Sequence, residues 1–207
     1  ARLLRGDILL PFPGRGEVVG EFSVTDVRLG TESDVEGNLV IDISEIRALS
    51  KLFGLVDNAS GQFEARATLD GTIAEPSVTA EFSLARGGFT YRPIGLELSD
   101  VDLSGTMDTD FRFDLSGTFR AGRGIGEIVS RADYSNADEP GLMFRIKGED
   151  LTLVNVPDVY VEADADVDIA LDRDTLKING EVTVPNALIK PRNITISKIN
   201  ESEDVVV

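Results

Sequence analysis

Hydrophobic and polar residues alternate along most of this chain. Between Gln62 and Asp70, every second position is apolar and the positions between them are polar or charged. An extended strand turns successive side chains to opposite faces, so this alternation predicts strands with one apolar face. The same pattern recurs at 18–24, 39–43, 77–84, 111–115, 142–146 and 176–184. It is longest at 159–172, where the apolar positions are odd and most of the even positions are acidic.

Turn signals separate these runs at short intervals, which predicts a succession of strands joined by tight turns. The signals are Asp70-Gly71, Arg86-Gly87-Gly88, Ser104-Gly105, Gly122-Arg123-Gly124, Glu139-Pro140-Gly141, Lys147-Gly148 and Asn179-Gly180. No stretch rich in Pro or Gly is long enough to be a linker, so we expect one continuous unit over residues 1–207.

One segment departs from the strand pattern. Ser44 can cap a helix whose apolar residues, from Ile46 to Phe53, fall at helical spacing, and Gly54 offers a stop. We therefore expect a short helix at 44–54 that covers one end or edge of the sheet.

Composition excludes several classes of function. The chain of 207 residues is 42% hydrophobic, as expected of a folded domain, and its formal charge of −17 disfavours nucleic acid as a partner. It contains no Cys and no His, so thiolate nucleophiles, imidazole bases and zinc sites are ruled out. Paired carboxylates could still act as acid and base, but 37 acidic residues single out no pair. We expect no enzyme activity and no cofactor.

Two motifs suggest ligand sites but fit them poorly. The run Asp164-Ala165-Asp166-Val167-Asp168 resembles half of a calcium loop, yet Ile169 and Thr175 stand where that loop needs Gly and Glu. Strand alternation explains these carboxylates without a metal. The glycines from Gly122 to Gly126 resemble a phosphate loop, but no helical pattern follows them, so a hairpin turn is the better interpretation.

A sheet with one apolar face must hide it in a sandwich, a closed barrel, a folded groove or lipid. An outer-membrane barrel would carry aromatic girdles, whereas this chain has no Trp and 3 Tyr. Several apolar positions are alanine, which leaves room for a ligand or, alternatively, lets two faces approach in a dry core. We predict an elongated antiparallel all-β sheet, curled lengthwise into a groove with a hydrophobic interior. Its predicted lining is Phe63, Ala65, Ala67, Leu69, Val78, Phe82, Leu84, Phe113, Phe144, Val161, Ala163, Ala165 and Val167.

Several stretches resemble the C-terminal (DUF490) region of the TamB family, in the wider AsmA-like group. They are 61–65, 70–78, 82–84 and 87–88, followed by 119–124, 146–151 and 180–187, in the order and spacing typical of that region. The resemblance covers about residues 18–190. Ala80 stands where the family often has Gly, and the strand at 159–172 is unusually acidic.

The resemblance implies a lengthwise-folded sheet, called a β-taco, with a hydrophobic interior. TamB-like proteins are anchored in the inner membrane, cross the periplasm of a Gram-negative-type envelope and meet the outer-membrane barrel TamA. They support phospholipid transport and the assembly of outer-membrane β-barrel proteins, including autotransporters. On this basis we expect a periplasmic segment of a larger chain that carries phospholipid or nascent outer-membrane protein, and that meets a TamA-like partner largely through regions outside this segment.

Two other functions remain open from the sequence. A chaperone-like scaffold could pair its exposed strand edge with an incoming β-strand, using backbone hydrogen bonds more than side chains. A rigid periplasmic spacer would need no cargo at all.

Overall fold

A computed structural model describes residues 3–12, 16–47, 56–135, 141–172 and 175–190. They form ten β-strands and one short 3₁₀ helix, so the all-β prediction is confirmed. The strands are β1 (Leu4–Phe12), β2 (Gly16–Thr25), β3 (Asp34–Ile43), β4 (Val56–Gly71), β5 (Pro76–Tyr91), β6 (Leu96–Met107), β7 (Arg112–Asp133), β8 (Gly141–Val156), β9 (Val159–Asp172) and β10 (Thr175–Ile189), and the helix is η1 (Val27–Glu32).

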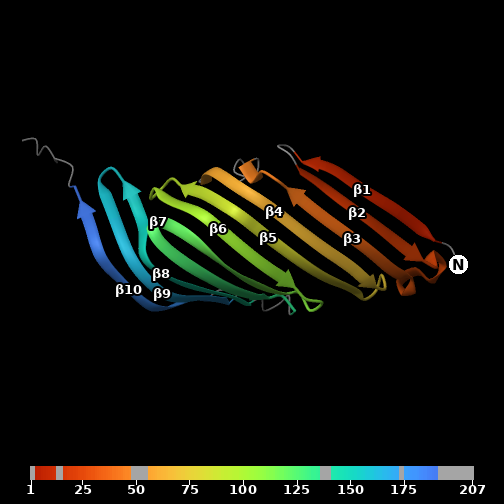
Figure 1. The fold of residues 1–207 in the computed structure, drawn as a ribbon. Helices are drawn as coiled ribbons and strands as arrows, with labels where there is room; N and C mark the ends of the chain where they lie inside the picture. The colour runs from red at the N-terminus through yellow and green to blue at the C-terminus, as the bar shows by residue number, and fades with distance from the viewer. Residues whose placement is uncertain (1–2, 13–15, 48–55, 136–140, 173–174, 191–207) are drawn as a thin grey trace, which may run out of the picture.

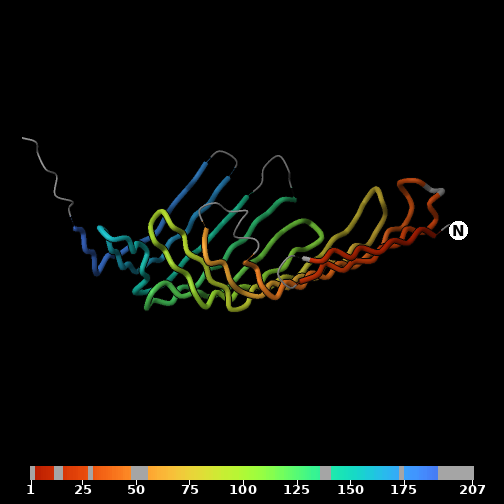
Figure 2. Tube along the Cα trace, turned by 90° about the horizontal axis from the view of Figure 1, so that it is seen from above, coloured from red at the N-terminus to blue at the C-terminus, as the bar shows by residue number. Residues whose placement is uncertain are grey.

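The strands make one antiparallel sheet in which each strand pairs with its neighbours in the sequence, from β1 to β10 (Figure 1). β1 and β10 are the two edges and do not pair with each other, so the sheet is open. Figure 2 shows that the sheet is strongly twisted, because the strands at the N-terminal end lie flat in this view while β8, β9 and β10 are steeply inclined. The strands at the C-terminal end also bend along their length (Figure 1).

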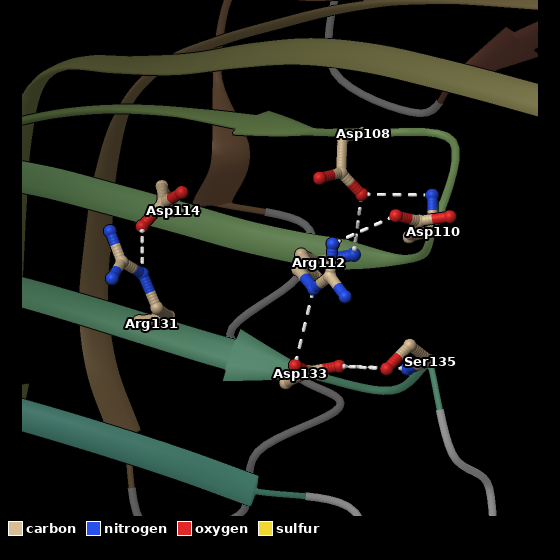
Figure 3. Close-up of polar contacts among 7 residues, drawn as sticks. All are labelled: Asp108, Asp110, Arg112, Asp114, Arg131, Asp133 and Ser135. Atoms are coloured by element: carbon tan, nitrogen blue, oxygen red, sulfur yellow. Dashed lines mark hydrogen bonds and ion pairs between the residues drawn. The ribbon is translucent and has the colours of Figure 1, made fainter.

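β7 folds back on itself and fills two places in the sheet. Its first half pairs with β6 and its second half with β8. Contacts join the two halves in antiparallel register: Arg112 bonds to Asp133, Asp114 to Arg131, and the Phe119 ring lies over Gly126. Figure 3 shows the strand that carries Asp114 beside the strand that carries Arg131. The reversal lies at Gly122, whose positive φ of 64° suits a tight turn, so the hairpin turn predicted there is confirmed.

The apolar residues share one face because cross-strand partners in a sheet point to the same side. One row of partners runs through Ile41, Ala65, Phe82, Gly105 and Leu115, from β3 to β7. Large side chains lie opposite glycine along this face. A Cβ added at Gly105, for example, would collide with the ring of Phe82. Glycine therefore gives the aromatic rings room to lie across the neighbouring strand.

A line of β-bulges crosses the sheet from β4 to β8. The register shifts at Asp57–Gln62, Leu84–Gly87, Ser99–Asp102 and Gly148–Leu151, and also at Gly122–Ile125, where the β7 hairpin turns. The shifts lie beside one another because the residues that flank them are cross-strand partners, as in Gln62 with Ala85 and Leu84 with Leu103. Buried apolar residues gather along this line, which we call the crease: Ala59, Val101, Ala121, Leu151 and Ala163. An extra residue bends a strand and increases its twist, so the crease is where the sheet bends.

Several turn predictions were wrong. The glycines of Arg86-Gly87-Gly88 and Lys147-Gly148 lie inside strands at the crease, and those of Ser104-Gly105 and Asn179-Gly180 also lie inside strands. These glycines make room for neighbouring strands instead of reversing the chain, since a Cβ added to any of them would approach a partner strand at 3.1 Å or less. Asp70-Gly71 does lead into the turn between β4 and β5, and 136–140 lie outside the described residues.

The predicted helix at 44–54 falls largely outside the described residues. Ile46 and Arg47 are in 3₁₀ conformation, and 48–54 are not described. The helix η1, which was not predicted, lies between β2 and β3, where the Ser33 hydroxyl donates a 3.0 Å hydrogen bond to the Asp26 carbonyl.

Candidate binding surface on the apolar face

All the residues predicted to line a groove lie on one face of the sheet, which we call the apolar face. Phe63, Ala65, Ala67 and Leu69 of β4 face Leu84, Phe82, Ala80 and Val78 of β5. Toward the C-terminal edge, on the same face, Phe144 of β8 pairs with Ile169 of β9. Ala163, Ala165 and Val167 of β9 pair with Leu151, Gly148 and Ile146 of β8. Phe113 faces Met107 of β6, and Val161 faces Val154 and Ala187. The alternation therefore found one continuous surface across strands that are distant in sequence.

The apolar face is open along much of its extent. Of the predicted lining residues Ala163 is buried, while the other twelve are half-buried. The accessible surface of the chain is 14775 Å², whereas a compact monomer of 22.3 kDa would expose about 9,400 Å². No second layer covers this face within the part of the chain that the structure describes. The half-burial comes from neighbouring side chains of the same sheet, so this surface can take a ligand without unpacking a core.

The apolar face continues to both edges of the sheet. In β10 every residue is exposed, and Leu176, Ile178 and Val182 show between 55% and 62% of their surface. In β1, Leu10 is 58% exposed. An edge strand that carries both unpaired backbone groups and exposed apolar side chains is a template for another strand.

Charged residues on the opposite face pair mainly with one another. Near the turn that enters β7, Arg112 bonds to Asp110 at 2.8 Å and to Asp133 at 3.2 Å, and Asp133 also accepts hydrogen bonds from Ser135 (Figure 3). The hydrogen bond that Arg112 donates to Asp133 raises the pKa of Arg112 above its ordinary value, and those that Ser135 donates lower the pKa of Asp133. Figure 3 also shows Arg131 beside Asp114, at 2.7 Å. These exposed pairs add little stability but keep this face wetted.

The acidic run in β9 belongs to this charged face. Arg145 of β8 reaches Asp166 at 2.8 Å and Asp168 at 3.9 Å, while Asp164 accepts a hydrogen bond from the backbone N–H of Asp150. The carboxylates are spread along an extended strand, as the sequence predicts, and each of these three has a protein partner.

A buried carboxylate at the crease was missed by the sequence analysis. Glu162 is 4% exposed and accepts hydrogen bonds from the Tyr160 hydroxyl at 2.6 Å, Arg123 at 2.9 Å and Asn186 at 3.1 Å. These bonds, that of Tyr160 first, lower the pKa of Glu162 to about 2. Three strands, β7, β9 and β10, meet at this side chain. In the sequence Glu162 is one of several acids in a regular run, so nothing distinguished it.

Two hollows lie largely among polar side chains, and the first of them also touches Ala65 and Phe82 of the predicted lining. One, of about 430 Å³, is lined mainly by side chains of the charged face between β4 and β7, with Glu64, Glu81 and Asp114 among them. The other, of about 470 Å³, lies at the crease and is lined by Asn58, Thr90 and Asp100 among others. Neither is a pocket of the apolar face.

A comparison with known families identifies the second half of the chain. Residues 114–207 match the family described as the TamB C-terminal domain. This stretch is a TamB-family region. The match contains the resembling stretches at 119–124, 146–151 and 180–187, whereas those between 61 and 88 lie outside it.

The TamB-family region holds most of β7 and all of β8, β9 and β10, which form the exposed C-terminal edge of the sheet. All four residues of the Glu162 cluster lie within it. The match of this stretch supports a TamB-like protein of the translocation and assembly module, and the TamB family is envelope-associated. No solved structure matches the chain. Among the described residues, no helix has the length and hydropathy needed to span a bilayer.

Proposed function

We propose that the apolar face shields lipid acyl chains or apolar polypeptide as they pass between the inner and outer membranes. The observation that carries the proposal is one open, continuous surface. The predicted lining residues on β4, β5, β7, β8 and β9 share it with their cross-strand partners on β3, β6 and β10. Each CH₂ that leaves water on this surface gains about 0.8 kcal/mol. An acyl chain can therefore be held without any specific polar contact, and without chemistry.

The segregation of charge supports the same function. The face that carries Glu64, Arg66 and Glu81 is polar and stays wetted, while the residues between them in sequence, such as Ala65 and Phe82, point to the other side. Because no buried polar side chain of the described residues lacks a hydrogen-bond partner, no such group competes for a ligand on the apolar face. Such a two-sided sheet suits a periplasmic path, with water on one side and cargo on the other.

In this proposal the chain is the periplasmic part of an inner-membrane-anchored protein. It supports phospholipid transport and the assembly of outer-membrane β-barrel proteins and autotransporters, and a TamA-like barrel is met largely through other regions. The match of residues 114–207 to the TamB C-terminal domain supports both points.

Site-specific photo-crosslinking in the full-length protein tests the proposal. A crosslinker at Ala67 or Ala165 should capture lipid or polypeptide in cells, since both residues are half-buried on the apolar face. The matched controls are Thr68 and Asp166, the next residues along each strand, which lie on the charged face. Equal capture at both faces would contradict a cargo surface. No capture at either face or along β10 would leave a rigid spacer.

A second function, strand templating, is favoured by the exposed edge of β10. There an incoming strand of an outer-membrane protein would pair with backbone groups that have no partner strand within the described chain. Crosslinkers along β10 would then capture protein, and crosslinkers at Ala67 would capture nothing. The two outcomes distinguish a conduit from a scaffold.

A further inference from the structure

The bulges of the crease share a backbone conformation that is costly for most residues. Asn58, Arg86, Asp100 and Asp150, on β4, β5, β6 and β8, have φ between 47° and 54°. None of them is glycine, and left-handed conformations of other residues persist only where their surroundings hold them. Contacts around each bulge must therefore hold it in this conformation.

At two of these bulges the holding group is an aspartate on the next strand. The Arg86 N–H donates a 2.9 Å hydrogen bond to Oδ1 of Asp102 on β6, and the Asp150 N–H donates a 2.8 Å bond to Oδ1 of Asp164 on β9. A bulge takes one backbone N–H out of the ladder, and in both places the carboxylate replaces the missing partner.

The two arrangements match in register as well as in chemistry. Asp102 lies between Leu103 and Val101, whose partners are Leu84 and Gly87 on β5. Asp164 lies between Ala165 and Ala163, whose partners are Gly148 and Leu151 on β8. In each case the aspartate sits opposite the extra residue, on the strand that follows the bulge. Two occurrences of the same geometry on different strand pairs indicate a repeated device.

We propose that Asp102 and Asp164 are positioning residues that fix the bend of the sheet at the crease, and that they thereby set how far apart the two flanks of the apolar face stand. Val101 and Ala163, the residues beside them, are buried, so side chains pack closely at this line. Without the aspartate carboxylate, the bulge N–H loses its hydrogen-bond partner. The residue with positive φ can then leave the left-handed conformation, and the strand straightens. The inference concerns the shape of the sheet and does not depend on cargo.

The crease has a further tie beyond β7. Because the β7 hairpin turns back at Gly122, the ends of β6 and β8 become neighbours beyond it, and the Asn155 N–H donates a 2.9 Å bond to the Ile94 carbonyl. The bent ends of the strands therefore hold one another, so a change of bend at one strand is expected to reach the next.

Distances between spin labels test the proposal on the whole chain without cargo. The protein has no cysteine, so labels can be placed at Met143→Cys and Asn155→Cys. Both are exposed positions of β8, and the bulge at Gly148–Leu151 and a second register shift at Thr152–Val154 lie between them. A straight strand of this length would span about 40 Å at 3.3 Å per residue, and a bent one spans less. Asp164→Ala should lengthen or broaden the distance distribution. Asp164→Asn, which keeps an acceptor oxygen, should restore the parent distribution.

The matched control is Asp168→Ala, on the same strand and the same face but away from the bulge. This variant should show the parent distance. The distance in the parent protein should also be the same with and without detergent micelles. An Asp164→Ala protein with the parent distance would overturn the proposal, as would equal changes in Asp164→Ala and Asp168→Ala. If Asp164→Ala loses its far-ultraviolet sheet signal, Asp102→Ala with labels at Thr79→Cys and Thr90→Cys of β5 is judged by the same criterion. If the parent protein captures no lipid at Ala67 while the distances change as expected in Asp164→Ala, the result counts against the proposed function alone.

Discussion

Replacing Gly126 by alanine should destabilise the protein because the added methyl group collides with the ring of Phe119. Gly126 is buried on the apolar face of β7, and an added Cβ would lie 2.7 Å from Cε1 and Cε2 of the Phe119 ring and closer still to Cζ. Ordinary contacts between such atoms are 3.4–4 Å, so the ring must move by about 1 Å. The backbone of Gly126 has no positive φ, and therefore the cost is steric alone. Overpacking of this kind lowers the free energy of unfolding by about 1–3 kcal/mol.

The same contact predicts a rescue. Phe119→Ala alone should cost about 2 kcal/mol, less than the loss for a fully buried phenylalanine, because the ring is half-buried. In the double variant the added methyl finds the space that the ring has left. Its destabilisation should be smaller than the sum of the single changes by about 1–2 kcal/mol. Urea unfolding followed by far-ultraviolet circular dichroism measures all four proteins.

Gly124→Ala is the control for this cycle. A Cβ at Gly124 would meet backbone atoms of Glu149 and Asp150, which no change at Phe119 can move. Its cost should therefore add to that of Phe119→Ala. If the Gly126 and Phe119 changes are additive within about 0.5 kcal/mol, the ring does not occupy the space over Gly126 and the packing argument for the apolar face is refuted.

Three further predictions concern the lining and the charged groups. Ala165→Asp places a carboxylate on the apolar face and should lower the free energy of unfolding, measured in urea, by about 1–3 kcal/mol. It should also abolish lipid capture by a crosslinker at Ala67. Because its folded pKa of about 2 lies below the ordinary value, Glu162 should contribute stability that is complete above about pH 5 and is lost as pH falls toward 2; Glu162→Gln should flatten this part of a pH–stability curve. Arg131→Ala breaks an exposed pair with Asp114 and should cost no more than about 1 kcal/mol, less at high salt, in the same unfolding assay.

The apolar face could be predicted because its rule is local. In a pleated strand the parity of a position decides its side, so Ala163, Ala165 and Val167 had to share a face whatever their neighbours were. The pairing of strands adjacent in sequence then joined these short stripes into one surface, since tight turns leave little other topology for an antiparallel sheet. That these residues share one face could therefore be predicted from alternation, while their role as a lining stays a prediction.

The turns inside strands could not be predicted from local chemistry. Arg86-Gly87-Gly88 supplies a positive φ and a missing side chain, which both a hairpin turn and a bulge use. Whether the chain reverses or continues depends on the register of β5 with β4 and β6, which is a non-local property. Gly105 also lies inside a strand, but it is no bulge: it leaves room for the ring of Phe82 on the neighbouring strand. Its role therefore depends on which residue pairs with it, and local chemistry does not show that.

The Glu162 cluster was equally out of reach, for an electrostatic reason. Asp164 and Asp166 next to it have the same parity and similar chemistry, but only Glu162 meets Arg123 and Asn186, which come from β7 and β10. Burial of a carboxylate is tolerated only where such partners converge. The partners lie far from Glu162 in sequence, so an isolated acid in a regular run carries no sign of them.

The crease, in contrast, leaves a mark in the sequence that alternation analysis can use. Each bulge adds one residue, so the apolar positions change parity across it: in β5 they are even as far as Leu84 and odd from Gly87 to Tyr91. In β6 they change in the same way between Leu98 and Val101. In the pair of β8 and β9 the extra residues lie on β8, so the apolar positions of β9 stay odd from Val159 to Leu171. A phase change in the alternation, with an aspartate on the following strand, therefore predicts where such a sheet bends.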